Sequence, residues 1–144
     1  MRAAQELRAD LLRQSQSTAI RDGLAIAFGL GAFLILHVGY IFVQASITNA
    51  FMAMVFLYFA TPVLAGGITG YFAQRQPLPA LLVLGVAVAI SVGVLHLLGP
   101  WLGFPTGAGD LGGSVTLAMF SLVFALPMVV IGGAVGSYIS RAHS

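Results

Sequence analysis

The sequence predicts an all-α integral membrane protein of four transmembrane helices, arranged as two tandem helical hairpins behind a short amphipathic N-terminal helix. Three observations lead to this fold: a scarcity of charge, four long apolar runs, and one helix pattern that occurs twice. Of the 144 residues, 59% are hydrophobic and 7% are charged, and the mean hydropathy is +1.01. A soluble domain carries about 25% charged residues to solvate its surface. We therefore expect one compact domain whose main solvent is lipid.

The few charges also exclude several classes of function. The net charge of +2 comes from six basic residues, all arginine, against four acids. This excess is too small and too confined to the chain ends to indicate nucleic-acid binding. The sequence has no cysteine, which excludes disulfides, thiolate metal sites, thiol catalysis and lipidation on cysteine.

Residues 1–22 form a polar segment ahead of the apolar runs. Ala4, Leu7 and Leu11 recur at helical spacing, which indicates a short amphipathic helix on the cytoplasmic membrane surface. A partly solvated terminal helix is the alternative, because large aromatic anchors are absent. We expect residues 14–18 (Gln-Ser-Gln-Ser-Thr) to break this helix, with Ser17 or Thr18 capping the next one.

Residues 23–144 contain the four-helix transmembrane domain. The spans are predicted at about 24–43, 50–73, 78–98 and 115–139. Twenty residues at roughly 1.5 Å each cross about 30 Å of hydrocarbon. The connections are short at 44–49 and 74–77, and residues 99–114 form a loop rich in glycine and proline.

The arginines predict the orientation of the spans. All six lie in the N-terminal segment, the 74–77 turn or the C-terminal tail. By the positive-inside rule, these three segments face the cytoplasm. We therefore expect an inner-membrane protein with both termini cytoplasmic, surrounded by the lipid bilayer.

The second and fourth spans share one sequence pattern. Met52–Pro62 and Leu117–Pro127 agree at six of eleven positions. A glycine triplet and an arginine then follow in the same order in both copies: Gly66, Gly67, Gly70 and Arg75 in the first, and Gly132, Gly133, Gly136 and Arg141 in the second. We interpret this as an internal duplication that relates two parallel hairpins by a pseudo-twofold axis along the membrane normal.

Each copy carries two features that shape helices. Pro62 and Pro127 fall within their spans and predict helix kinks, serving either for packing or as a hinge or exposed carbonyl on a permeation path. The carbonyl that Pro62 deprives of its partner needs another donor in lipid, and Thr61 is the candidate. The GxxxG pairs predict close helix contacts within the monomer, contacts to another subunit, or an opening for a small solute.

Four polar residues form a candidate polar or haem site toward the outer ends of the first and third spans. His37, Tyr40 and Gln44 recur on one helix face, and His96 lies on the third span. Two histidines on different helices are the minimum for a bis-histidine haem b. The other readings are interfacial histidines bonded to a carbonyl, water or headgroup, or histidines in a proton relay or substrate contact.

The chemical groups that the sequence lacks limit its function further. No carboxylate lies within a span, which disfavours proton-coupled antiport and a charged cation filter. The sequence also shows no paired carboxylates, metal-ligand cluster or nucleophile–base pair, so we expect no enzymatic activity, metal or cofactor.

The remaining prediction is a non-enzymatic multi-pass membrane protein that acts through helix–helix association. It would be a homo-oligomeric pore or carrier, or an accessory subunit among other membrane chains. The alternative is an electron-transfer membrane subunit that binds haem b through His37 and His96.

Overall fold

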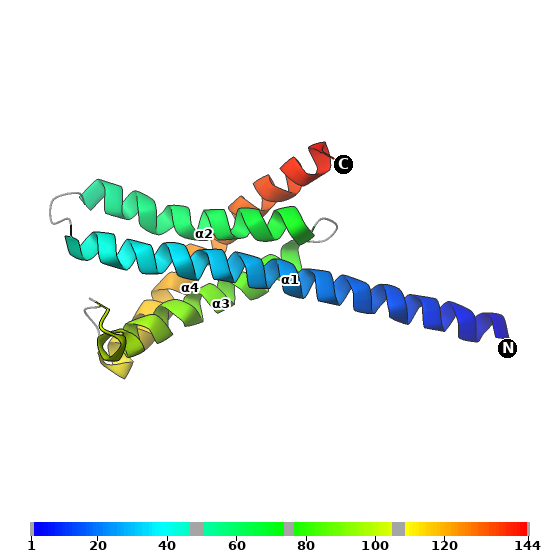
Figure 1. Cartoon of the computed structure of the whole chain (residues 1–144), viewed down its shortest axis with the longest axis horizontal. Coiled ribbons are helices and arrows are strands. Elements are labelled where there is room, and N and C mark those ends of the chain that lie inside the picture. The colour runs from blue at the N-terminus through cyan, green and yellow to red at the C-terminus, as the bar shows by residue number, and fades with distance from the viewer. Residues whose placement is uncertain (1, 47–50, 74–76, 105–108, 144) are drawn as a thin grey trace.

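The chain folds into a bundle of four long helices. The computed structural model describes residues 2–46, 51–73, 77–104 and 109–143. The helices are α1 (Arg2–Ser46), α2 (Phe51–Ala73), α3 (Pro77–Leu98) and α4 (Leu111–Ala142), with a short 3₁₀ helix, η1 (Gly99–Leu102), after α3 (Figure 1). All four α-helices are long and apolar enough to cross a membrane. The prediction of an all-helical protein with four candidate spans is confirmed.

The helices alternate in direction. α1 and α3 run one way through the bundle, and α2 and α4 run the other way (Figure 1). The most extensive contact joins α2 to α4, followed by the contact between α3 and α4. α1 lies against α2 and α3, and its described residues do not pack against those of α4. The two helices that share a sequence pattern therefore make the largest helix–helix contact of the bundle.

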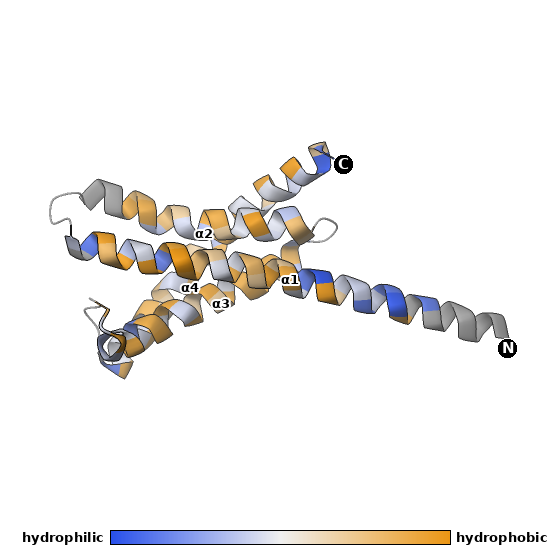
Figure 2. Cartoon of the chain, in the orientation of Figure 1, coloured by the Kyte–Doolittle hydropathy of each residue, from blue (hydrophilic) through white to orange (hydrophobic). Residues whose placement is uncertain are grey.

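The bundle has a narrow apolar interior and an apolar exterior. Leu84, Val88 and Val92 recur every fourth residue on α3, so they share one face, and they pack with Phe33 and Val129. Large apolar side chains are exposed on all four helices, and Figure 2 shows hydrophobic residues along the whole bundle. An apolar exterior of this extent is stable in contact with lipid chains and would promote aggregation in water.

α1 differs from its prediction. It is one continuous helix, so the predicted break at residues 14–18 is wrong. The hydroxyls of Ser17 and Thr18 both donate to the Gln14 carbonyl at 2.9 Å, which satisfies them inside the helix in place of a cap. The first part of α1 projects beyond the other helices, with residues 12–20 exposed (Figure 1). The predicted N-terminal helix is thus continuous with the first span.

The connection before α4 is shorter than its prediction. η1 occupies the start of the predicted 99–114 loop, and α4 begins at Leu111. Asp110 has an extended backbone, and its carboxylate accepts a hydrogen bond from the Gly113 N–H at 2.6 Å. This is N-capping, in which an acidic side chain satisfies an amide that has no partner within the helix. The lone acid of the loop therefore fixes the start of α4.

The continuity of α1 is testable with spin labels, because the chain has no native cysteine to remove. Labels at Asp10→Cys and Leu24→Cys should be about 21 Å apart along a straight helix. Pulsed electron–electron double resonance spectroscopy in nanodiscs measures this distance. Labels at Leu24→Cys and Leu36→Cys, within the first span, give the reference for an unbroken helix. A broad or much shorter distance for the first pair alone would show that the helix breaks at residues 14–18.

Candidate functional site

The glycines of α2 and α4 lie against the backbone of the opposite helix. A Cβ atom on Gly66 would overlap the carbonyl of Val129, and one on Gly132 would overlap the carbonyl of Val63. Val63 precedes Gly66 by three residues, as Val129 precedes Gly132. The contacts are therefore reciprocal: equivalent glycines meet equivalent carbonyls.

The second pair of glycines repeats this arrangement one turn further along. A Cβ atom on Gly70 would overlap the backbone of Gly133, and one on Gly136 would overlap the backbone of Gly67. Such close approach is possible only without side chains, which is why small residues four apart favour helix contacts in membranes. We call the contact made by Gly66, Gly70, Gly132 and Gly136 the glycine crossing.

Hydroxyl groups add polar links around the glycine crossing. Ser137 on α4 donates to the Gly70 carbonyl at 3.0 Å and is also within 2.8 Å of the carbonyl of Gly133, one turn earlier. Thr69 on α2 donates to the Ala25 carbonyl of α1 at 3.1 Å. Both hydroxyls are buried. Interhelical hydrogen bonds of this kind hold membrane helices together where lipid offers no competing partner.

The middle glycines of the two triplets have different surroundings. A Cβ atom on Gly133 would overlap the Leu81 side chain of α3, whereas one on Gly67 would lie 3.6 Å from the Gly132 carbonyl, an ordinary contact. Gly67 lines an open apolar groove between α2 and α4. The reciprocity of the glycine crossing therefore does not extend to the surrounding helices.

The two prolines also differ in their surroundings. Pro62 is buried and Pro127 is exposed. Thr61 donates to the Tyr58 carbonyl at 3.1 Å, and this is the carbonyl four residues before Pro62 that loses its helical partner. The predicted role of Thr61 is confirmed. Beside Pro127, the Leu126 side chain packs against Gly85 of α3.

His37 is the most deeply buried of the predicted polar residues. Its side chain is only 2% exposed. Its ring stacks on Phe33, with ring centroids 5.0 Å apart, and Tyr40 and Tyr58 lie at 5.7 and 6.3 Å. Among the described residues, neither ring nitrogen has a hydrogen-bond partner. Three aromatic rings from α1 and α2 therefore hold the imidazole in the interior.

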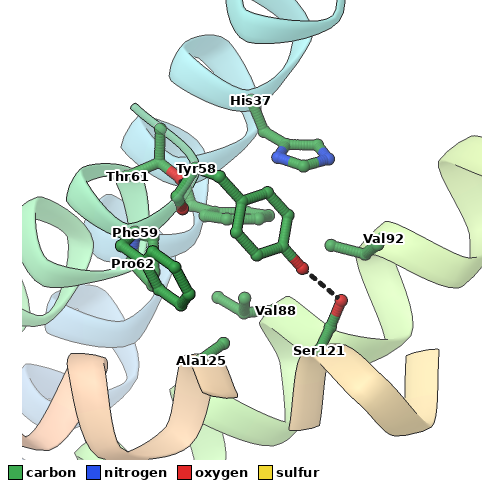
Figure 3. Close-up of a pocket in the computed structure, with 10 residues that line it drawn as sticks. His37, Tyr58, Phe59, Thr61, Pro62, Val88, Val92, Ser121 and Ala125 are labelled. Carbon is green, nitrogen blue, oxygen red and sulfur yellow. Dashed lines mark hydrogen bonds between the residues drawn. The ribbon is translucent and has the colours of Figure 1, made fainter. Parts of the chain in front are cut away.

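A small cavity lies beside His37 (Figure 3). Its volume is about 10 Å³, counted as the space open to the centre of a water-sized sphere. The Tyr58 and Ser121 hydroxyls, 3.0 Å apart, form a hydrogen bond at its wall that joins α2 to α4 (Figure 3). The other lining residues are mostly apolar: Phe33, Phe59, Thr61, Pro62, Val88, Val92 and Ala125.

The structure brings together only part of the predicted polar set. Tyr40 is half-buried beside His37, whereas Gln44 is exposed further along α1. His96 is half-buried near the end of α3, and its Nδ1 has no partner among the described residues. His96 is not among the residues that line the cavity beside His37. The site therefore centres on His37.

The surroundings of His37 fit a haem poorly. An axial ligand must point a ring nitrogen at an iron in the plane of a porphyrin. The cavity beside His37 has room for about one water molecule, and His96 does not line it. Haem ligation would require Phe33, Tyr58 and neighbouring side chains to move apart. Ligation by His37 and His96 stays a prediction that this packing disfavours.

The polar residues that link the helices were not singled out from the sequence. Ser121, Thr69 and Ser137 all have buried hydroxyls that bond across helices. A serine or threonine within an apolar span is a weak signal, because its hydroxyl can equally bond to its own helix. Thr116 does so, donating to the Gly112 carbonyl at 2.9 Å.

Comparison of the chain with protein-family models, curated proteins and solved structures found no match.

The glycine crossing predicts different effects on stability for two glycine-to-alanine substitutions. Gly136→Ala places a methyl group against the Gly67 backbone and should destabilise the protein by about 1–3 kcal/mol, as overpacking does. Gly67→Ala meets only an ordinary contact, so it should be neutral or raise stability by about 0.5–1 kcal/mol through helix propensity. Thermal unfolding in detergent or nanodiscs compares them. Equal melting temperatures for the two variants would contradict the crossing.

The hydrogen bond between Thr69 and Ala25 gives a second comparison. Thr69→Val keeps the side-chain shape and removes the hydrogen-bond donor. It should lower the free energy of unfolding by about 0.6 kcal/mol, and by ~1.7 kcal/mol at most. Thr116→Val removes an exposed bond within one helix and is the matched control. The same thermal assay applies, and the link between α1 and α2 would be unsupported if Thr116→Val lowered the melting temperature as much as Thr69→Val.

Proposed function

We propose that the protein is a non-enzymatic multi-pass membrane protein that acts as an accessory subunit of a larger membrane complex. The glycine crossing is the observation that carries this proposal. It brings the backbones of α2 and α4 into direct contact, within the most extensive contact between two helices of the chain. The cavity beside His37 has room for about one water molecule. A permeation path through a single copy has no support in this packing.

The glycine crossing also bears on how copies could associate. Gly66, Gly70, Gly132 and Gly136 are buried against backbone inside one chain, so this fold does not offer them to another subunit. A homo-oligomeric pore or carrier would need a different surface between copies. That surface would come from lipid-facing side chains, for which lipid tails are equally good partners. The accessory role is therefore the better supported of the two forms of association.

The projecting part of α1 is the candidate surface for a partner. Within residues 12–20 it carries Leu12 and Ile20, with exposed fractions of 58% and 66%. The N-terminus of α1 and the C-terminus of α4 lie at the same end of the bundle (Figure 1). With Arg13, Arg21 and Arg141 on these parts of α1 and α4, the positive-inside rule places this part of α1 in the cytoplasm of an inner-membrane protein. We infer that it contacts a cytoplasmic part of the complex.

Gentle extraction of the natural membrane into nanodiscs, followed by native mass spectrometry, tests this proposal. We expect a second chain to accompany the protein. Leu12→Ser combined with Ile20→Ser should release that chain, because the variant loses the exposed apolar groups of α1. Gln14→Ser combined with Gln16→Ser is the control on the same segment and should retain it.

Two other outcomes would contradict the accessory role. A stable ring of identical copies without a second chain would favour the homo-oligomeric pore. A strictly monomeric species in nanodiscs would contradict both forms of association.

A further inference from the structure

The imidazole of His37 is buried without a hydrogen-bonding group of the described chain beside either nitrogen. A neutral imidazole has one donor and one acceptor. Leaving a buried polar group without a partner costs about 1–3 kcal/mol, and such groups in native proteins are normally bonded to protein or ordered water. We therefore expect the ring to hydrogen-bond to a ligand that also contacts the side chains around it.

We propose that His37 binds one water molecule, which bridges it to the Tyr58–Ser121 hydroxyl pair. The rings of His37 and Tyr58 are neighbours in an edge arrangement, with centroids 6.3 Å apart, and they make no direct hydrogen bond through the imidazole. Both rings and Ser121 line the same cavity (Figure 3). The water joins α1 to the hydrogen bond between α2 and α4.

The size and walls of the cavity select water over larger ligands. The centre of a water-sized sphere can occupy about 10 Å³, close to the roughly 10–15 Å³ that holds one water molecule. A buried water commonly makes about three hydrogen bonds. The imidazole of His37 and the hydroxyls of Tyr58 and Ser121 supply three polar groups, and the remaining wall is mostly apolar.

The imidazole is packed against an aromatic ring of its own helix. The ring lies on Phe33, one turn earlier on α1, and the two rings are nearly parallel at 20°. The Tyr58 carbonyl, another acceptor on the facing helix, already receives the Thr61 hydroxyl at 3.1 Å. The bridging water thus explains why a histidine is placed among aromatic rings in the interior of a lipid-facing bundle.

Solid-state NMR of the full chain in lipid bilayers tests the proposal directly. Magnetisation is transferred from water protons to ¹⁵N-labelled histidine rings and ¹³C-labelled valine methyl groups, and the His37 signal is assigned by its loss in His37→Phe. We expect transfer from water to the His37 ring, and none to the methyl groups of Val129, which is 0% exposed in the same core. A His37 ring with no more water contact than Val129 would overturn the proposal.

Matched tyrosine variants test the bridge. Tyr58→Phe should strongly reduce water transfer to His37, because it removes one of the two hydroxyls proposed to hold the water. Tyr71→Phe removes the same group from an exposed position outside this cavity and should leave the transfer unchanged. Undiminished transfer in Tyr58→Phe would show that the water does not bridge to the hydroxyl pair.

Thermal unfolding adds a readout that does not depend on the NMR signal. If water couples the two side chains, His37→Phe combined with Tyr58→Phe should lower the melting temperature by less than the sum of the two single shifts. Additive shifts would mean that the side chains act independently, which contradicts the bridge.

Discussion

The backbone contact between α2 and α4 determines the geometry of the rest of the bundle. Four glycines without side chains let two parallel helices approach until carbonyls of one lie where Cβ atoms of the other would be. In lipid, apolar side chains gain little by leaving the tails for one another. Close packing and hydrogen bonds must then supply the association energy, and the glycine crossing provides the packing.

Helices that touch at one crossing separate on either side of it. On one side, the space between α2 and α4 is filled by Tyr58, which reaches Ser121, and by His37 from α1. Alongside the crossing itself, an apolar groove stays open between the two helices, and its lining includes Gly132, Gly136 and Val135. The polar cavity and the apolar groove are therefore both bounded by the two helices that make this contact.

α3 and α1 complete the bundle in unequal ways. α3 contacts both crossing helices, and Leu81 fills the position beside Gly133. α1 reaches α2 through the hydroxyl of Thr69 and does not pack against the described part of α4. A pseudo-twofold relation between the hairpins would make these contacts equivalent. The glycine contacts between α2 and α4 are reciprocal, whereas the contacts of α1 and α3 are not, and the predicted pseudo-twofold arrangement of the hairpins stays a prediction.

The sequence was informative about features that depend on composition and local order. Charge scarcity and apolar length predicted four helices, and the sequence alone identified Thr61 as the donor beside Pro62. Helix boundaries were less predictable, because a serine or threonine serves equally as a cap or as a donor to the preceding turn. Ser17 and Thr18 took the second role, and α1 continued through them.

Contacts between distant residues could not be read from the sequence for a different reason. The pattern showed that two glycine faces exist, but several helix arrangements would bury them equally well, including contacts between copies. Only the three-dimensional packing shows that each glycine of the crossing lies opposite a carbonyl of the other helix, three residues before the equivalent glycine. The same holds for Tyr58 and Ser121, which are 63 positions apart.

The positions of His37 and the glycines together explain where polarity is tolerated in this protein. Backbone contact at the glycine crossing leaves no space for a water molecule and needs no side chain to exclude one. Where α2 and α4 separate, a large aromatic side chain must fill the gap, and tyrosine does so while bringing a hydroxyl into the interior. A buried hydroxyl needs partners in a low-dielectric medium. Ser121 is one partner of the Tyr58 hydroxyl. The proposed bridging water is the other, and it links this hydroxyl to the imidazole of His37 across the cavity.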